Sequence, residues 1–553
     1  MAQVHGSLFG LVLLSACSGP IDTLDESSDG RPVGSILQAT TTVDDPLFPE
    51  QWGLYNTGQA VPQPIGDDGD TLDVPGVPGV DIKITEAWDI TQGSSSVLVG
   101  LAETTDVDVY HEDFHNQIWR NRDEVVDGID NDGNGCIDDV FGCDFMNQDG
   151  VFDPVGTHAT HVAGIISARI KNGKGVVGTA PKVKLVPLTS TVKDQSFVEA
   201  IEYAKNLGVR VISISQGSPK ENDFDPAVRQ AMAQADILFV CSADNRATPR
   251  FNYPSSYDEP NILSVANVEN TGELWRHSSY GPHVDLAAPG TAILSTTPGD
   301  EYGYGTGTSQ AAPQVAGVAA LIMNKFSELS VLEVRDRILR TAMRMTTLDS
   351  WVGSAAMVDA ESALRDVGPL KLSATTAPGS VKLRWYGDLE ATRYEVERDG
   401  VVVDNGASTT HKHAGLVVDS GHIYRVRAFH GSRTQPWSHR LFAKATRMPR
   451  SQAWFEASPH PYPNDFSEHY TVHKSGASRL RVHFSRLTSL PGDILEYERN
   501  FEFEETVGED LYGDYPDGFW THWVDGDTFD FDFTSDSSNT AYGFEIDRIE
   551  YFK

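Results

Sequence analysis

One stretch of small and apolar residues constrains the fold of this chain most. It runs from Gly305 to Phe326 and reads GTGTSQAAPQVAGVAALIMNKF. A glycine-rich turn leads into Ser309, and the run that follows predicts a buried helix packed close to neighbouring backbone. Ser309 would then stand at a helix N-terminus, where free N–H groups and the helix dipole stabilise a developing oxyanion. Taken alone, a serine that merely caps a core helix is the simpler interpretation.

A second stretch, 156–168, reads GTHATHVAGIISA. His158 and His161 are three residues apart and share one face of a predicted short helix. One of them can serve as a general base while the other packs or forms hydrogen bonds. Zinc is not expected, because the zinc-protease pattern needs histidines four residues apart with an intervening glutamate.

Together the two stretches resemble the signatures of subtilisin-like serine proteases. GTSQAAPQVAG at 307–317 resembles the family's Gly-Thr-Ser-Met-Ala-Ala-Pro-His-Val-Ala-Gly, and HATHVAG at 158–164 resembles His-Gly-Thr-His-Val-Ala-Gly. The resemblance covers about 44–367. It implies Ser309 as nucleophile, His158 as base and the chain order acid, histidine, serine.

The fold class follows from the same resemblance and from the hydrophobic pattern. Apolar runs such as 96–102 suit strands buried on both faces, and they alternate with helical patterns. We therefore expect an α/β catalytic domain with a subtilisin-like doubly wound parallel sheet, followed by two all-β sandwich domains. The site should lie at the carboxyl ends of the strands.

The acid of the proposed triad departs from the family pattern. Family members place an Asp after the strand at 96–102, but this chain has Glu103-Thr-Thr-Asp106. We expect Glu103 to orient His158, although its carboxylate is one methylene farther from the backbone. Asp106 is the alternative acid, and it requires a shift of three residues. A site with no functional acid is the third possibility.

The oxyanion hole and the substrate segment are also inferred from the resemblance. Asn245 ends a segment that resembles Ala-Ala-Gly-Asn, which makes it the oxyanion donor. Asp244 replaces the glycine and would set a negative charge beside the developing alkoxide. Ser215, Gln216 and Gly217 resemble the Ser-Leu-Gly segment that pairs with an extended substrate backbone.

The strongest metal signal is the loop 127–139, DGIDNDGNGCIDD. Oxygen atoms at alternate positions can converge on calcium, and the intervening glycines permit the tight turn. The expected ligands are Asp130, Asp132, Asn134, the carbonyl of Cys136, and Asp138. The loop lacks a bidentate glutamate at its twelfth position, so it is not a full EF-hand, and a solvated acidic turn is the alternative.

The cysteines fit an exported protein. Cys136 and Cys143 bracket the acidic loop and could close a disulfide that braces it. Cys241 lies in an apolar strand and is expected to be a buried, inert thiol.

The charge balance limits the partners. The chain of 553 residues carries a net charge of −36 and has a pI near 4.7. Nucleic acid is not an expected partner, because phosphate binding needs a basic surface. Protein or peptide substrates are expected instead.

The N-terminus indicates export. A short apolar run at 8–14 precedes Leu14-Ser-Ala-Cys17, which resembles a bacterial lipobox. We expect residues 1–17 to be a signal peptide whose Cys17 carries a lipid and attaches the protein to a membrane, with a plain signal peptide as the alternative. Residues 18–43 form a polar tether, too short for the usual pro-domain. The protein would be an outer-envelope lipoprotein or secreted.

Two β-rich segments follow. Residues 369–447 alternate apolar and polar positions and resemble a fibronectin type III domain, with Trp385 and Tyr424 in its core. Residues 450–553 resemble a CUB-like β-sandwich. Such modules often bind proteins or glycans.

The resulting hypothesis is a secreted or surface-anchored serine endopeptidase. The rival hypothesis is a catalytically weak or inactive lipoprotein that binds peptides or proteins. Glu103, Asp244 and the missing pro-domain favour the rival, whereas Ser309, His158 and Asn245 favour the enzyme.

Overall fold

The computed structural model describes most of the chain beyond the tether. The predicted signal peptide, Cys17 and nearly all of residues 18–43 lie outside the described residues. Within the described part, no helix is both long and apolar enough to cross a bilayer. The described residues are 41–64, 71–365, 367–388, 390–446, 449–490, 493–500, 506–511, 514–515, 518–521, 523–537 and 540–552.

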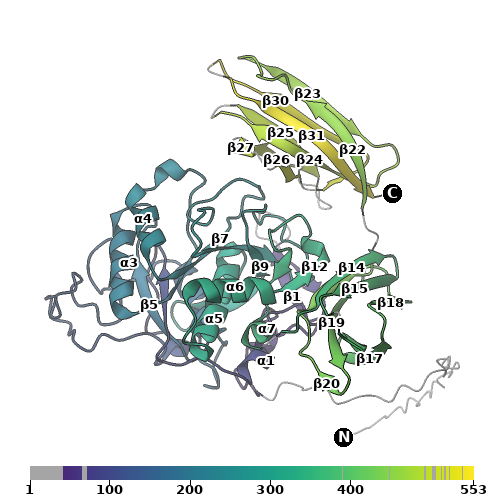
Figure 1. Cartoon of the computed structure of the whole chain (residues 1–553). Helices are drawn as coiled ribbons and strands as arrows, with labels where there is room; N and C mark the ends of the chain where they lie inside the picture. Colours follow the sequence, from purple (N-terminus) through teal and green to yellow (C-terminus); the bar gives the residue numbers. More distant parts are fainter. Residues whose placement is uncertain are drawn as a thin grey trace, which may run out of the picture.

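A parallel sheet forms the centre of residues 44–367, the predicted catalytic region (Figure 1). Neighbouring strands in its central part pair in parallel. Every residue of β6 to β9 is buried. This confirms the predicted doubly wound α/β fold. The strands, in spatial order, are β4 (Cys143–Asp144), β5 (Lys184–Thr189), β3 (Leu98–Ala102), β6 (Val211–Ile214), β7 (Leu238–Ser242), β8 (Ile262–Val268) and β9 (Leu286–Pro289).

Helices cover both faces of this sheet. Alternate residues of each strand point to opposite faces, so each strand contributes side chains to two separate cores. Val211 and Leu238 pack in a core with α2, α5 and α6, whereas Ile212 and Phe239 pack in a second core with α3 and α4. The helices are α1 (Ile84–Trp88), α2 (His158–Ser167), α3 (Gln195–Leu207), α4 (Pro226–Gln234), α5 (Thr308–Lys325), α6 (Val331–Thr341) and α7 (Ala360–Leu364).

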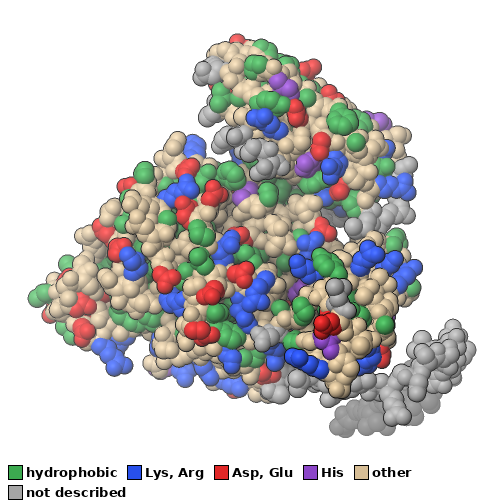
Figure 2. All heavy atoms as spheres, in the orientation of Figure 1, with side chains coloured by type: hydrophobic (Ala, Val, Ile, Leu, Met, Phe, Trp, Pro, Cys, Tyr) green, Lys and Arg blue, Asp and Glu red, His purple; other side chains and the backbone are tan. Residues whose placement is uncertain are grey.

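Short elements complete the catalytic region. Two antiparallel hairpins join β1 (Ala60–Pro64) to β2 (Thr71–Pro75), and β10 (Ile293–Thr297) to β11 (Glu301–Gly305). Acidic and basic side chains are interspersed over the face of the molecule seen in Figure 2. The 3-10 turns are η1 (Phe48–Glu50), η2 (Glu112–Phe114), η3 (Glu221–Asp223) and η4 (Thr346–Leu348).

The central sheet continues into the first β-rich region. After β9 come β13 (Ala356–Met357) and β12 (Met343–Met345), and β12 pairs in parallel with β21 (Leu441–Lys444). The sheet therefore crosses the predicted boundary at 367–369 and reaches 14 strands. Its outer strands are β19 (Gly421–His430), β20 (Arg433–Thr434), β16 (Arg393–Arg398) and β17 (Val401–Gly406).

A second, three-stranded sheet packs on these outer strands. It holds β14 (Lys371–Ala377), β15 (Ser380–Tyr386) and β18 (Thr410–Ala414). Trp385 and Tyr424 are buried between the two sheets. Arg440 forms ion pairs with Asp359 and Glu361, which ties this region to α7. The specific likeness to fibronectin type III stays a prediction.

The last β-rich region forms two antiparallel sheets, at the top of Figure 1. Its Arg481 lies 5.6 Å from the ring centre of Trp351 in the catalytic region, so the two regions touch. The likeness to a CUB domain stays a prediction. One sheet holds β22 (Arg450–Ala457), β31 (Gly543–Phe552), β24 (Arg479–Thr488), β27 (Asp514–Tyr515), β28 (Phe519–Trp520) and β29 (Val524–Asp525); the other holds β23 (Ser467–His473), β30 (Thr528–Thr534), β25 (Ile494–Asn500) and β26 (Thr506–Leu511).

Candidate active site

Ser309 lies in the first turn of α5, directly after the turn that the sequence predicted. Gly307 is the N-cap residue, with φ of +157°, and a Cβ added there would lie 3.2 Å from Asn245 Nδ2. Glycine therefore lets the Asn245 side chain approach the start of α5. The Ser309 Oγ is half-buried and lies 3.4 Å from the carbonyl oxygen of Ser215.

A proline inside α5 explains how Ser309 forms a hydrogen bond with the residue that follows β6. Pro313 has no N–H, so it leaves the carbonyl of the residue four positions earlier without its helical partner. That residue is Ser309, and the Ser215 Oγ donates to its carbonyl at 3.2 Å. The end of β6 and the start of α5 are thus held together beside the candidate nucleophile.

His158 is the first residue of α2, and its Nδ1 lies 3.1 Å from Glu103 Oε2. Glu103 follows β3, and its side chain is only 3% exposed, whereas that of His158 is 43% exposed. The longer acid therefore reaches the imidazole from inside the protein. The other oxygen, Oε1, is buried and has no hydrogen-bond partner among the described residues.

The pKa values of the two histidines of α2 are shifted in opposite directions. Burial lowers the pKa of His158, but the hydrogen bond and charge of Glu103 outweigh it, so the pKa lies above the usual 6.5. Burial lowers the pKa of His161 to about 4. The His161 Nε2 lies 3.0 Å from the carbonyl oxygens of Ile293 and Gly303, so it carries a proton and donates. His161 is a neutral packing residue.

Asp106, the alternative acid, is engaged elsewhere. Its carboxylate accepts hydrogen bonds from the hydroxyl of Thr189, at 2.8 Å, and from the N–H of Asp153, at 2.9 Å. Burial raises its pKa. Asp106 therefore anchors the loop ahead of α2, and Glu103 is the acid that contacts His158.

Asn245 follows β7 and is exposed. Its Oδ1 accepts hydrogen bonds from the Thr308 N–H at 2.8 Å and from the Thr308 hydroxyl at 3.0 Å. These donors fix the side-chain amide so that Nδ2 is left to donate. The sequence analysis missed Thr308, although it lies beside Ser309 in the same motif.

Asp244 has φ of +93°, in the region that favours glycine. Its carboxylate forms an ion pair with Arg246. The expected negative charge beside Asn245 is therefore paired, and the sequence analysis did not include Arg246.

The predicted substrate segment follows β6. The Gln216 amide donates to the carbonyls of Ala102, at 3.2 Å, and Ser190, at 2.9 Å. Its side chain thus braces the ends of neighbouring strands. Ser215 contacts Ser309, and Gly217 is exposed.

The acidic loop brings together only part of the predicted ligand set. Oxygen atoms of Asp130, Asp132 and Glu124 lie within 4.8 Å of one another. Glu124 is only 4% exposed, and its Oε2 has no hydrogen-bond partner among the described residues. Glu124 lies outside the motif, so no spacing rule pointed to it.

Two predicted ligands have other roles in the loop. The Asp138 carboxylate accepts hydrogen bonds from the N–H groups of Asp127 and Gly128. The Asn134 Oδ1 accepts one from the Cys136 N–H at 2.9 Å. Their side chains shape the loop, and their assignment as ligands stays a prediction.

The cysteines are arranged as the sequence suggested. Cys136 and Cys143 are joined in a disulfide that closes the segment 136–143, which overlaps the end of the acidic loop. Cys241 is free and buried, and burial raises the pKa of its thiol.

The parallel sheet, the serine at the start of α5 and the histidine–carboxylate pair at the start of α2 all lie in one part of the chain that matches a known family. The sequence profile of the Subtilase family (Peptidase S8) matches residues 94–372, about half of the chain. The chain therefore belongs to the subtilase family.

Individual relatives agree. The thermophilic serine proteinase of Bacillus sp. (strain AK1) is 31% identical over 268 residues, 47% of this chain and 60% of that protein. The major intracellular serine protease of Bacillus subtilis (strain 168) is 31% identical over 290 residues, 49% of this chain and 84% of that one. Subtilisin Savinase of Lederbergia lenta is 33% identical over 214 residues, which are 38% of this chain and 77% of that protein. The matched part of this chain thus spans less than two thirds of the length of some relatives.

A solved structure of a protease from Pseudoalteromonas arctica also aligns with the chain. The TM-score is 0.44 at 26% identity, over 59% of this chain and 99% of that one.

Proposed function

We propose that the protein is a serine endopeptidase of the subtilase type. The observation that carries the proposal is the 3.1 Å contact between His158 Nδ1 and Glu103 Oε2, at the start of α2. A carboxylate in this position holds the imidazole in the tautomer that leaves Nε2 free to accept a proton.

The roles of the other groups follow from the chemistry of peptide hydrolysis. Ser309 attacks the peptide carbonyl while His158 takes the hydroxyl proton and then gives it to the leaving amine. Asn245 Nδ2 and the Ser309 N–H stabilise the oxyanion. Glu103 stabilises the imidazolium that forms between the two transfers.

Protein or peptide chains are the proposed substrates. The backbone of 215–217 follows a sheet strand and ends in exposed Gly217, which suits pairing with an extended peptide. The Gln216 side chain binds the carbonyls of Ala102 and Ser190, and these hydrogen bonds hold the segment in place for this pairing.

Covalent labelling tests the proposal. A fluorophosphonate should label the parent protein, and Ser309→Ala should abolish the label. Ser95→Ala, which changes an exposed serine before β3, is the matched control and should label like the parent. A folded parent that takes no label, yet binds peptides, would favour the rival function of a peptide-binding protein.

The pH dependence of catalysis should reveal the Glu103–His158 pair. His158 accepts a proton only when neutral, so activity should appear as the pH rises through its raised pKa. We expect the acid limb of kcat/KM to have its midpoint above 6.5. Glu103→Gln should move that midpoint to lower pH, because it removes the hydrogen bond and charge that raise the pKa. Equal midpoints in both proteins would contradict the pairing.

We also propose that Glu124, Asp130 and Asp132 hold a structural calcium ion. Three carboxylates at close range, one of them buried with an unpaired oxygen, fit a hard cation that prefers oxygen ligands. Bound calcium would neutralise these charges and fix the loop directly before the Cys136–Cys143 disulfide.

Calcium should therefore stabilise the folded protein. At a hundredfold excess over Kd, the gain in unfolding free energy should be about 2.7 kcal/mol. Glu124→Gln should remove most of this calcium-dependent gain, measured by thermal unfolding with calcium or with a chelator. Asp138→Asn is the control: it should lower the basal stability but retain the calcium response, because Asp138 binds backbone N–H groups. A loss confined to Asp138→Asn would reverse the assignment.

Export and anchoring are further proposals from the sequence. Lipid attachment at Cys17 would be tested by metabolic labelling with a fatty acid, with Cys17→Ser as the control. Binding of proteins or glycans by the β-rich regions would be tested on the full chain.

A further inference from the structure

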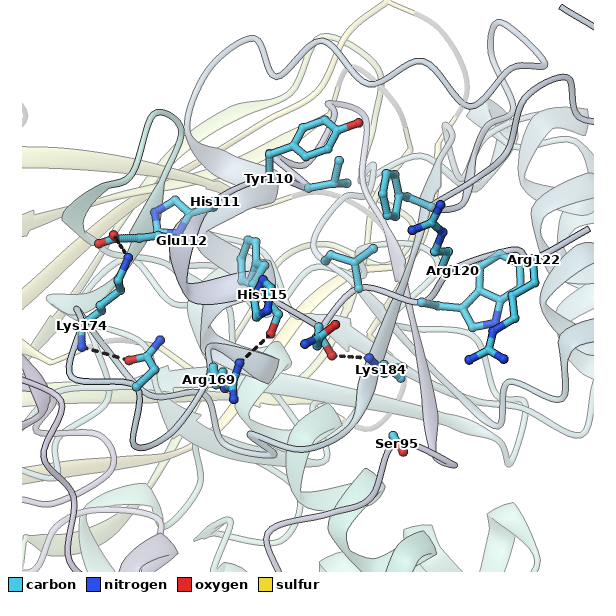
Figure 3. A pocket seen from close by; sticks show the side chains of 17 residues that line it. Ser95, Tyr110, His111, Glu112, His115, Arg120, Arg122, Arg169, Lys174 and Lys184 are labelled. Carbon is cyan, nitrogen blue, oxygen red and sulfur yellow. Dashed lines mark hydrogen bonds and ion pairs between the residues drawn. The ribbon is translucent and has the colours of Figure 1, made fainter. Parts of the chain in front are cut away.

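The residues drawn as sticks in Figure 3 line a cavity of about 820 Å³ on the catalytic region. It is lined in part by Arg169, which follows the end of α2, whereas His158 begins that helix. A helix of this length spans roughly 15 Å. Lys184 and Ser95 also line the cavity, and they stand at the amino ends of β5 and β3. Glu103 follows the carboxyl end of β3, so the cavity lies at the opposite end of the sheet.

The cavity is positively charged in a chain that is strongly acidic. Among the described residues that line it, Glu112 is the only carboxylate, and it forms an ion pair with Lys174. The whole chain carries a net charge of −36, so the charge of the cavity is opposite in sign to that of the chain. The lining cations are Arg120, Arg122, Arg169, Lys174 and Lys184.

Two of these cations are held next to each other by consecutive carbonyl groups. Arg169 Nη1 donates to the carbonyl of His115, at 3.4 Å, and the Lys184 ammonium donates to that of Asn116. Among the described residues, no carboxylate lies within 4.0 Å of either cation. Each cation also has further N–H groups. Burial and the charge of Arg169 lower the pKa of Lys184, as expected for two neighbouring cations.

Two more cations without a carboxylate partner in the described part of the chain lie to one side (Figure 3). These are Arg120 and Arg122, both exposed. The Arg120 guanidinium lies 5.9 Å from the centre of the Phe141 ring, which lines the same cavity. Figure 3 draws the guanidinium groups of Arg120 and Arg122 pointing in opposite directions. The cavity therefore offers one pair of neighbouring cations, Arg169 and Lys184, and two single guanidinium groups.

We infer that this cavity binds a multivalent oxyanion, a ligand that carries at least two phosphate or sulfate groups. One group would lie at Arg169 and Lys184, and another at the Arg122 guanidinium. Tetrahedral oxyanions match the many N–H donors of these cations, since arginine forms paired hydrogen bonds with such groups. Bound anions would also offset the repulsion among the cations.

Titration calorimetry on the full chain at low ionic strength tests the inference. Sucrose octasulfate is the sulfate probe, and fructose bisphosphate is the phosphate probe. The parent should bind at least one of them, and the tighter one identifies the source of the oxyanion. The double variant Arg169→Gln/Lys184→Gln should bind at least tenfold more weakly. The control Lys205→Gln/Lys382→Gln makes the same change in net charge at exposed sites and should bind like the parent.

Folding is checked by the thermal unfolding midpoint. If the double variant unfolds, Arg122→Gln takes its place, because Arg122 is exposed and should be replaceable without loss of structure. It should weaken binding at least threefold. The inference is overturned if the parent binds neither probe, if the pocket variants bind like the control, or if a hexaglutamate peptide binds more tightly than both probes. The last result would assign the cavity to acidic polypeptides.

Discussion

Replacing Glu103 by glutamine is expected to lower kcat by roughly 10⁴, the loss seen when the triad acid of a serine protease becomes an amide. The glutamine amide can donate toward His158 Nδ1, which favours the tautomer with its proton on Nε2. That tautomer cannot take the serine proton. The KM should change little, because Glu103 is buried behind the imidazole and does not face the substrate. Steady-state kinetics on a chromogenic peptide measures both constants.

Two further variants isolate the cause. Asp106→Asn makes the same chemical change three residues later, where the carboxylate holds Thr189 and Asp153, and it should leave kcat nearly unchanged. Glu103→Asp shortens the acid and should lower kcat by roughly 10- to 100-fold, since small displacements of a catalytic group are costly. A rise in kcat for Glu103→Asp would mean that the longer acid holds His158 poorly.

Replacing Asn245 by alanine is expected to lower kcat by roughly 10² to 10³, with little change in KM. The side chain is held by Thr308, so its Nδ2 is already oriented before substrate arrives. A donor that is oriented in advance stabilises charge that develops only in the transition state. The same kinetic assay, with labelling of Ser309 by fluorophosphonate, measures the effect.

Asp244→Asn is the matched control for Asn245→Ala. It removes a charge from the adjacent residue but retains the side-chain shape. Since Arg246 already pairs with Asp244, kcat should change less than threefold. A tenfold rise in kcat would show that the Asp244 charge opposes the oxyanion in spite of Arg246.

The sequence predicted the parts of the fold that depend on local patterns. The apolar runs around β3, β6 and β7 were recognisable because strands buried on both faces are apolar throughout. The serine at the start of α5 was recognisable because small residues and glycine precede a long helix. These features depend on residues that are close together in the chain.

Features that depend on distant residues were harder to predict. Whether Glu103 reaches His158 depends on the distance between the end of β3 and the start of α2, which the sequence does not contain. Glu124 joins Asp130 and Asp132 only because the loop folds back on it. The basic cavity gathers cations from segments far apart in the chain, so no motif marks it.

The pairing of β21 with β12 extends the folded unit beyond the part of the chain that matches the subtilase family. The subtilase match ends at residue 372, yet Phe442 of β21 lies fully buried in a core with Met345 of β12. A chain cut at that match would leave an open strand edge and an uncovered apolar surface, both of which favour aggregation. The outer strand β17 therefore belongs to the same continuous sheet against which α5, and with it Ser309, packs. A partner bound at β17 would be attached to the sheet that carries the candidate site.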